Sequence, residues 1–253
     1  MLLAIDIGNS NIVFGGVRND KIIFQFRIAT DYIKTQDQYE LEIKNLLHMY
    51  DIKSNEIFDC IISSVVPPVF NSIHNAVKNI IKKNPMIVKS DMQTKINICT
   101  DNPTAVGSDL IVTAAATITE YEPPLIIIDM GTATTITVVD EGNLFLGGAI
   151  IPGVQISMEA LINRAAQLPA IQLKKPTKVI GKNTIERMCS GIIYGAASML
   201  DGMIERMEKE LGKEMIAIAT GGMAEYIVPI CNHKMHLEKD LLLKGLNIIY
   251  KLN

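Results

Sequence analysis

One short pattern occurs twice in this chain, and the repetition is the feature that most constrains its fold. Residues 2–14 and 125–139 each start with an apolar run, continue with an aspartate two residues before a glycine, and resume with a second apolar run. This pattern predicts a β-hairpin with polar groups at its tip. A single copy would most often be an ordinary tight turn, whereas an internal repeat indicates that a structural unit is duplicated. We therefore predict two similar units of domain size, over residues 1–118 and 119–253.

Both hairpin tips contain residue types that suit phosphate binding. Gly8 and Gly131 allow the backbone to approach an anion closely, and neighbouring amides and short side chains can donate hydrogen bonds. Asp6 and Asp129 precede these glycines and can each hold a hydrated cation. Mg²⁺ in particular prefers one or two carboxylates together with phosphate oxygens. Two units with such tips predict a cleft in which an anionic ligand binds.

Composition excludes several classes of partner. The chain has 24 basic and 27 acidic residues and a net charge of −3, so it lacks the basic footprint of a nucleic-acid or anionic-membrane binder. No apolar run approaches the roughly 18 to 20 residues of a membrane span, and a strand-like pattern starts at Leu2, so we expect a cytoplasmic protein. Four widely spaced cysteines are expected to be reduced packing residues; they are Cys60, Cys99, Cys189 and Cys231.

Hydrophobic periodicity predicts alternating strands and helices in both units. In the first unit we expect strands over 21–27 and 59–66 and helices over 37–50, from Pro67 onward, and over 110–120. In the second we expect strands over 144–151 and 215–219 and helices over 154–166 and 184–211, the last capped by Asn183. The second unit's final strand stops at Thr220–Gly222, the position that Ser63–Ser64 occupies in the first unit. The duplication is therefore expected to extend beyond the hairpins.

The predicted helix over 184–211 contains three glycines, Gly191, Gly195 and Gly202. A glycine inside a helix costs about 1 kcal/mol relative to alanine, so the glycines indicate close approach by another element. That element can belong to the same unit or to a second copy of the chain, and the sequence leaves both open.

A further candidate is Asp109, which follows Gly107 and directly precedes an apolar helical run. A carboxylate at this position can face a ligand, or it can cap the helix, as aspartate does well. Its position alone does not decide between the two roles.

Seven groups of residues, in order along the chain, resemble the motif set of the type III pantothenate kinases. They are Asp6–Ser10, Ser63–Pro67, Asn102–Pro103 with Gly107 and Asp109, Asp129–Thr134, Gly147–Gly153, Gly181–Thr184 and Thr220–Gly222. The resemblance extends from Leu2 to the ending at Leu243–Leu246. It implies an α/β fold, namely the duplicated two-lobe actin-like ATPase (ribonuclease H-like) architecture with a nucleotide cleft between the lobes. It also implies a homodimer.

The activity implied by the resemblance is transfer of the ATP γ-phosphoryl group to the hydroxyl of pantothenate, giving 4'-phosphopantothenate in the first step of coenzyme A biosynthesis. Such a transfer needs in-line positioning, neutralisation of charge and a base for the hydroxyl proton. By match to the family, Asp109 is the general base, Asp6 positions Mg²⁺, and Asp129 is associated with a monovalent cation, K⁺ or NH₄⁺.

The resemblance also implies the remaining binding residues. Those expected to hold ATP and its phosphates, besides Asp6, are Gly8, Asn9, Ser10, Asn11, Gly131, Thr132, Gly221 and Gly222, the last two at the adenosine. Those expected to bind pantothenate are Gly107, Ser108, Asp109 and Thr184.

Two departures from the family pattern fall on the pantothenate side. The segment Lys89–Lys95 replaces a Gly-Pro-Gly-x-x-Thr-Gly motif, and Leu110 stands where the family has an arginine. An active pantothenate kinase is favoured over two alternatives, a non-catalytic or regulatory paralogue and a kinase of another small hydroxyl compound. Lys89 or Lys95 is a candidate replacement for the missing arginine.

Overall fold

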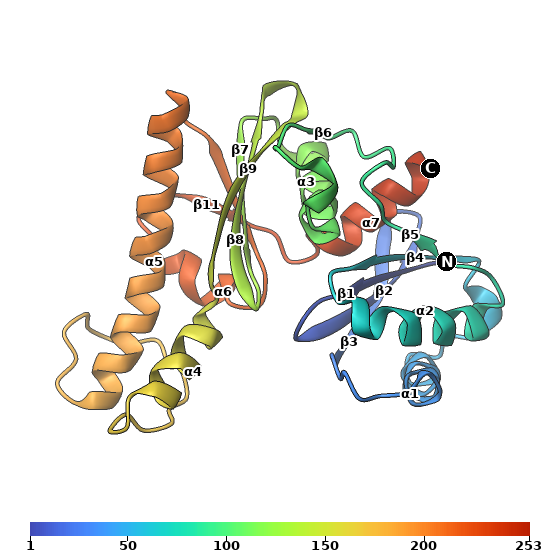
Figure 1. Cartoon of the computed structure of the whole chain (residues 1–253), viewed down its shortest axis with the longest axis horizontal. Coiled ribbons are helices and arrows are strands. Elements are labelled where there is room, and N and C mark those ends of the chain that lie inside the picture. The colour runs from blue at the N-terminus through green and yellow to red at the C-terminus, as the bar shows by residue number, and fades with distance from the viewer. The chain divides into compact units, whose positions relative to one another are not determined.

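A computed structural model describes all 253 residues, and the chain divides into two compact units (Figure 1). The first unit contains Met1–Glu120 and Asp240–Asn253, and the second contains Tyr121–Lys239. The break after Glu120 lies close to the one predicted after residue 118. Residues 240–253 differ from the prediction, which assigns them to the second unit, because they pack within the first.

The first unit is built on a five-stranded sheet in the order β3-β2-β1-β4-β5. Its strands are β1 (Leu2–Ile7), β2 (Asn11–Arg18), β3 (Lys21–Ala29), β4 (Asp59–Ser64) and β5 (Met86–Ile87). The first three pair antiparallel, and β4 and β5 continue the sheet in parallel with β1. Every residue of β1 is buried, as expected for a central strand covered on both faces.

Two layers of helices cover this sheet. α1 (Gln36–Met49) and α2 (Pro67–Ile81) enclose one face, where Leu3, Ile5 and Ile7 pack with Tyr39 and Ile73. On the other face α3 (Ser108–Glu120) and α7 (Leu241–Leu252) pack on the alternate residues of β1, Leu2 and Ala4. The unit also contains the short strand β6 (Asn97–Ile98).

The C-terminal helix α7 joins the first unit through a close contact with α3, which Figure 1 shows beside it. Leu243, Leu246 and Ile249 enter the core beneath the sheet. A side chain at Gly245 would collide with the carbonyl oxygen of Val112 in α3. The glycine therefore lets the two helix backbones approach, which gives the Leu243–Leu246 ending a packing role.

The second unit repeats the first. Its strands are β7 (Leu125–Met130), β8 (Ala133–Asp140), β9 (Leu144–Pro152), β10 (Ile216–Thr220) and β11 (Met235–Leu237). They lie in the order β9-β8-β7-β10-β11, the order of the first sheet. In each sheet the pairing of the second and third strands also has a register irregularity, at Gly16–Val17 in β2 and at Val138–Val139 in β8. Asp6 lies opposite Ser63 in one sheet and Asp129 lies opposite Thr220 in the other, so the predicted duplication is confirmed at single-residue register.

Helices α4 (Val154–Arg164), α5 (Thr184–Leu211) and α6 (Ala224–Ile227) share a core with this second sheet. The predicted bounds of α5 are confirmed, and the Asn183 side chain accepts a hydrogen bond from the Glu186 amide at its start. All four cysteines are free, but Cys99 is exposed, so the packing role predicted for it is wrong. No helix combines the length and hydrophobicity needed to cross a bilayer.

Candidate active site

The first hairpin tip lies between β1 and β2. The amide of Gly8 donates to the carbonyl oxygen of Asn11 across the turn at 3.1 Å, and Asn9, Ser10 and Asn11 are exposed. A side chain at Gly8 would lie 3.1 Å from that same oxygen, which is tighter than ordinary contact. Glycine therefore keeps the turn narrow while the following residues face solvent.

A series of serines connects this hairpin to the start of α3. Asp6 is 6% exposed and lies opposite the fully buried Ser63 of β4. The Ser63 and Ser108 hydroxyl oxygens are 3.0 Å apart, and the Ser108 hydroxyl also accepts from the amide of Ser64 at 3.2 Å. The hydrogen bonds thus join Ser108 to Ser63, the residue that lies opposite Asp6 in the sheet, although Asp6 and Ser108 are distant in sequence.

Asp109 lies in the first turn of α3 and not at a cap position, because the helix begins at Ser108. Its Oδ1 accepts from the neighbouring Leu110 amide at 2.8 Å. Burial raises the pKa of the Asp109 carboxyl, and hydrogen bonds from backbone amides oppose this rise only in part. A side chain at Gly107 would collide with Asp109 Oδ1, so Gly107 provides the space that the carboxylate occupies.

A cavity of about 670 Å³ opens beside this helix start in the first unit. Its lining contains Gly107 and Ser108, the end of β4, and part of the segment that departs from the family motif. The lining residues are Ser64, Val65, Val88, Lys89, Ser90, Asp91, Thr104, Val106, Gly107, Ser108 and Ile111. Lys89 is the single basic residue among them. Lys95, Asp109 and Leu110 do not line the cavity.

The second hairpin tip, Gly131–Thr132, gathers most of the predicted residues of the second unit. Asp129 lies at the end of β7, opposite Thr220 of β10. Gly221 has a φ of +92°, and a side chain there would lie 2.6 Å from Asp129 Oδ1, so glycine is required on both counts. A side chain at Gly222 would instead meet nothing within 4 Å. The two glycines therefore differ. Gly221 allows close packing against β7 within its own unit, and Gly222 borders open space.

Gly153, which directly precedes α4, packs against this second tip. A side chain at Gly153 would collide with the carbonyl oxygen of Thr132 and lie 2.7 Å from that of Gly131. The contact holds the start of α4 against the predicted phosphate loop. Gly153 belongs to the motif Gly147–Gly153, but the sequence did not indicate this contact.

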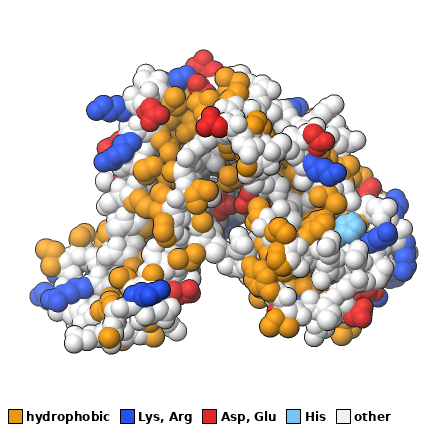
Figure 2. Space-filling view, in the orientation of Figure 1, with side chains coloured by type: hydrophobic (Ala, Val, Ile, Leu, Met, Phe, Trp, Pro, Cys, Tyr) orange, Lys and Arg blue, Asp and Glu red, His pale blue; other side chains and the backbone are white.

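Thr184 lies apart from the other predicted residues, in a cavity of about 810 Å³ between α4 and α5. This cavity is lined mainly by apolar side chains, with Arg187 beside Thr184, and none of the predicted phosphate-binding residues lines it. Gly191 and Gly195 line it too, and a side chain at either would meet nothing within 4 Å. Figure 2 shows exposed hydrophobic side chains together with lysine and arginine at the lower end of this unit, where α4 and the start of α5 lie.

Two solved structures share this fold. A Campylobacter jejuni protein assigned to the Baf family of transcriptional activators aligns with a TM-score of 0.62 and 19% identity, covering 98% of this chain and 97% of its own. A Porphyromonas gingivalis protein assigned as an N-acetylglucosamine kinase aligns with a TM-score of 0.52 and 12% identity, covering 100% and 99%. The duplicated sheets and these alignments define a two-lobe α/β protein of the actin and hexokinase class.

Sequence comparison then specifies the family. Residues 2–206 match the family model for type III pantothenate kinase. A type III pantothenate kinase of Exiguobacterium sp. strain AT1b is 43% identical over 253 residues, covering 100% of this chain and 99% of the relative. The chain belongs to the type III pantothenate kinase family. Its activity is the ATP-dependent phosphorylation of pantothenate, the first step of coenzyme A biosynthesis.

Proposed function

We propose that Asp109 is the general base that accepts the proton of the pantothenate hydroxyl, and that the two hairpin tips bind the phosphates of ATP. The observation that carries the proposal is the Asp109 carboxylate itself. It is half-buried, and desolvation raises its pKa. It occupies the space left by Gly107, a residue that lines a cavity of about 670 Å³. A base with a raised pKa accepts a proton more readily from a poorly acidic hydroxyl.

The proposed ATP contacts follow from the exposed tips. Asn9, Ser10 and Asn11 present their amides and short side chains in the first unit, and Gly131 and Thr132 do so in the second. The open space at Gly222 suits the approach of the adenosine, whereas Gly221 acts through its own unit's packing.

The donor set near Asp6 suits an Mg²⁺ ion carried by the nucleotide. Ser63 lies opposite Asp6 in the sheet, and the structure contains no group of three or more His, Cys, Asp or Glu residues that could form an all-protein site. Mg²⁺ held by one carboxylate and phosphate oxygens matches this arrangement. When bound, the ion would neutralise phosphate charge, and Asp6 would fix its position.

We also propose that Asp129 holds K⁺ or NH₄⁺ near the second tip, since a chain with a net charge of −3 has no excess of basic residues to offset phosphate. Turnover is expected to depend on added K⁺ or NH₄⁺. The variant Asp129→Ala should lower both this dependence and kcat by about tenfold or more, in line with the loss of a contact to a charged group. Initial rates would be measured in potassium, ammonium and tetramethylammonium buffers of equal ionic strength.

Asp140→Ala is the matched control, because Asp140 belongs to the same hairpin but lies at the other end of β8, where it pairs with Lys213. It should retain the dependence on K⁺. Equal wild-type rates in potassium and tetramethylammonium would contradict the assignment.

A homodimer in which α5 forms part of the interface, and in which Thr184 reaches the partner's substrate site, is proposed from the open glycine face. Gly191 and Gly195 are exposed and nothing in their own unit fills the space beside them. Gly195→Leu is therefore expected to separate the subunits while each unit stays folded. Light scattering after size-exclusion chromatography would give the mass.

Glu205→Leu places the same side chain at another exposed position of α5 and should leave the dimer intact. A wild-type monomer with full activity at low concentration would refute the proposed dimer.

Coupled measurement of ADP release, with and without pantothenate, tests the proposed function as a whole. Release that requires pantothenate and is lost in Asp109→Asn supports it. Pantothenate-dependent release that persists in Asp109→Asn removes the base assignment.

A further inference from the structure

The segment between β3 and α1 is hydrogen-bonded to the first hairpin tip at two points. The hydroxyl of Thr30 donates to the carbonyl oxygen of Gly8 at 2.6 Å, and the amide of Thr30 donates to the carbonyl oxygen of Ser10 at 3.0 Å. Thr30 therefore binds the Gly8–Asn9 and the Ser10–Asn11 peptide groups of the tip. No sequence motif had singled out this residue.

These bonds determine which way the tip presents its donors. In a planar trans peptide the carbonyl of one residue and the amide of the next point in opposite directions. Because Thr30 binds the Gly8 carbonyl, the Asn9 amide points away from Thr30. Asn9 is exposed, so its amide is available to an anion in solvent. Successive backbone amides with such an orientation form the concave donor sites that bind phosphate.

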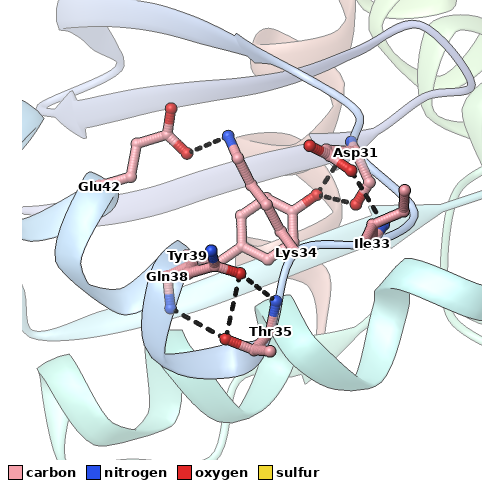
Figure 3. Close-up of polar contacts among 7 residues, drawn as sticks. All are labelled: Asp31, Ile33, Lys34, Thr35, Gln38, Tyr39 and Glu42. Atoms are coloured by element: carbon pink, nitrogen blue, oxygen red, sulfur yellow. Dashed lines mark hydrogen bonds and ion pairs between the residues drawn. The ribbon is translucent and has the colours of Figure 1, made fainter.

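Tyr39 of α1 holds the segment that carries Thr30 (Figure 3). This side chain is fully buried, and its hydroxyl donates to the Asp31 carbonyl oxygen at 2.7 Å and accepts from the Asp31 amide at 3.0 Å. Burial raises the pKa of Tyr39, so the hydroxyl stays protonated and can act as a donor. Lys34 closes over the ring, 5.5 Å from its centroid, and pairs with Glu42 at 2.8 Å.

The next residues fix the start of α1. Thr35 caps the helix, and its amide donates to the Gln38 side chain at 2.8 Å in a capping box. The Asp31 carboxylate also accepts from the Ile33 amide at 2.9 Å, which tightens the turn between them. The segment from Thr30 to Thr35 is thus held at both ends by side chains of its own unit.

We propose that Thr30 is a positioning residue for phosphoryl transfer: its hydroxyl orients the Gly8–Asn9 peptide toward the ATP phosphates, and Tyr39 holds Thr30 in place. This inference rests on the proposed role of the first tip in binding ATP. It assigns to Thr30 a task that neither its position after a strand nor the family's motif set had indicated.

Thr30→Val tests the proposal because it removes the hydroxyl, keeps the β-branched shape and retains the backbone bond to Ser10. We expect KM for ATP to rise about 2- to 12-fold, as for loss of one hydrogen bond, with KM for pantothenate unchanged. Thr30→Ser should restore KM for ATP, because it keeps the hydroxyl. Tyr39→Phe should raise KM for ATP in the same direction. Thr119→Val is the control, since the Thr119 hydroxyl also donates to a backbone carbonyl, that of Ala115 at 2.9 Å in α3.

The outcomes separate this inference from the proposed function. Asn9→Ala, measured in parallel, reports whether the tip binds ATP at all. If Asn9→Ala weakens ATP binding and Thr30→Val does not, the positioning role is wrong and the phosphate site stands. If neither variant changes KM for ATP, both are wrong. Equal losses in Thr30→Val and Thr30→Ser, or equal increases in both KM values, would also overturn the positioning role, because the hydroxyl would not be the cause.

Discussion

Asp109→Asn is expected to lower kcat by about 10²- to 10⁴-fold, the usual contribution of a positioned acid or base. ATP affinity should change little, because the asparagine oxygen can still accept from the Leu110 amide, as Asp109 Oδ1 does at 2.8 Å. Steady-state rates and nucleotide binding, measured on the same preparation, separate the two effects. Asp101→Asn is the control, since Asp101 is an exposed carboxylate in the same connecting region. Near-full kcat in Asp109→Asn would rule out the general-base role.

The pH profile gives an independent check on Asp109. The base must be ionised to accept a proton, and burial raises its pKa. The acid side of the kcat/KM profile should therefore fall off at a higher pH than for an ordinary aspartate, and this limb should vanish in Asp109→Asn.

The effect of Asp109 on stability has the opposite sign from its effect on activity. A folded-state pKa above the unfolded value contributes stability at low pH, and this contribution is lost as pH rises through the folded pKa. At pH 7 the ionised carboxylate therefore opposes folding, and Asp109→Asn should have a Tm equal to or above that of the wild type. A lower Tm would mean that Asp109 stabilises the native structure.

Lys89→Ala is expected to raise KM for pantothenate by about 10- to 150-fold. Pantothenate carries a carboxylate, and Leu110 cannot make the paired charge-assisted bonds of the family arginine. Lys89 lines the cavity beside Ser108 and forms no ion pair in the structure, so we propose that it binds this carboxylate. Loss of a hydrogen bond to a charged group is worth about 1.5 to 3 kcal/mol, which corresponds to this change in KM.

Lys95→Ala is the matched control, because Lys95 belongs to the same segment and does not line the cavity. An analogue with a neutral amide in place of the carboxylate should show the same KM with wild type and Lys89→Ala. Leu110→Arg should change little if Lys89 supplies the charge. A lower KM in Leu110→Arg, together with no effect of Lys89→Ala, would show that the wild-type site lacks a cation for the carboxylate.

Much of the fold was predictable because its signals are local. The period-2 and period-3.6 patterns located the longer strands and most helices, and the Asn183 cap located the start of α5. They did not locate α7 or the short elements β5, β6, β11 and α6. The repeated Asp-x-Gly pattern predicted the duplicated architecture, since each copy encodes the same hairpin within a few residues. The candidate residues at both tips were likewise visible, because glycine, a hydroxyl and a carboxylate occur close together in the chain.

Other features depend on segments that are distant in sequence and meet only in the folded chain. The packing of α7 on α3 requires that Gly245 approach Val112. The residues around Gly245 do not indicate that Val112 is its contact. The same holds for the contact of Thr30 with Gly8 and of Ser108 with Ser63. The sequence alone does not distinguish Lys89 from Lys95, but in the folded chain Lys89 lines the cavity and Lys95 does not. Gly221 and Gly222 look equally permissive in sequence, and they differ because only Gly221 adopts a positive φ against the backbone of β7.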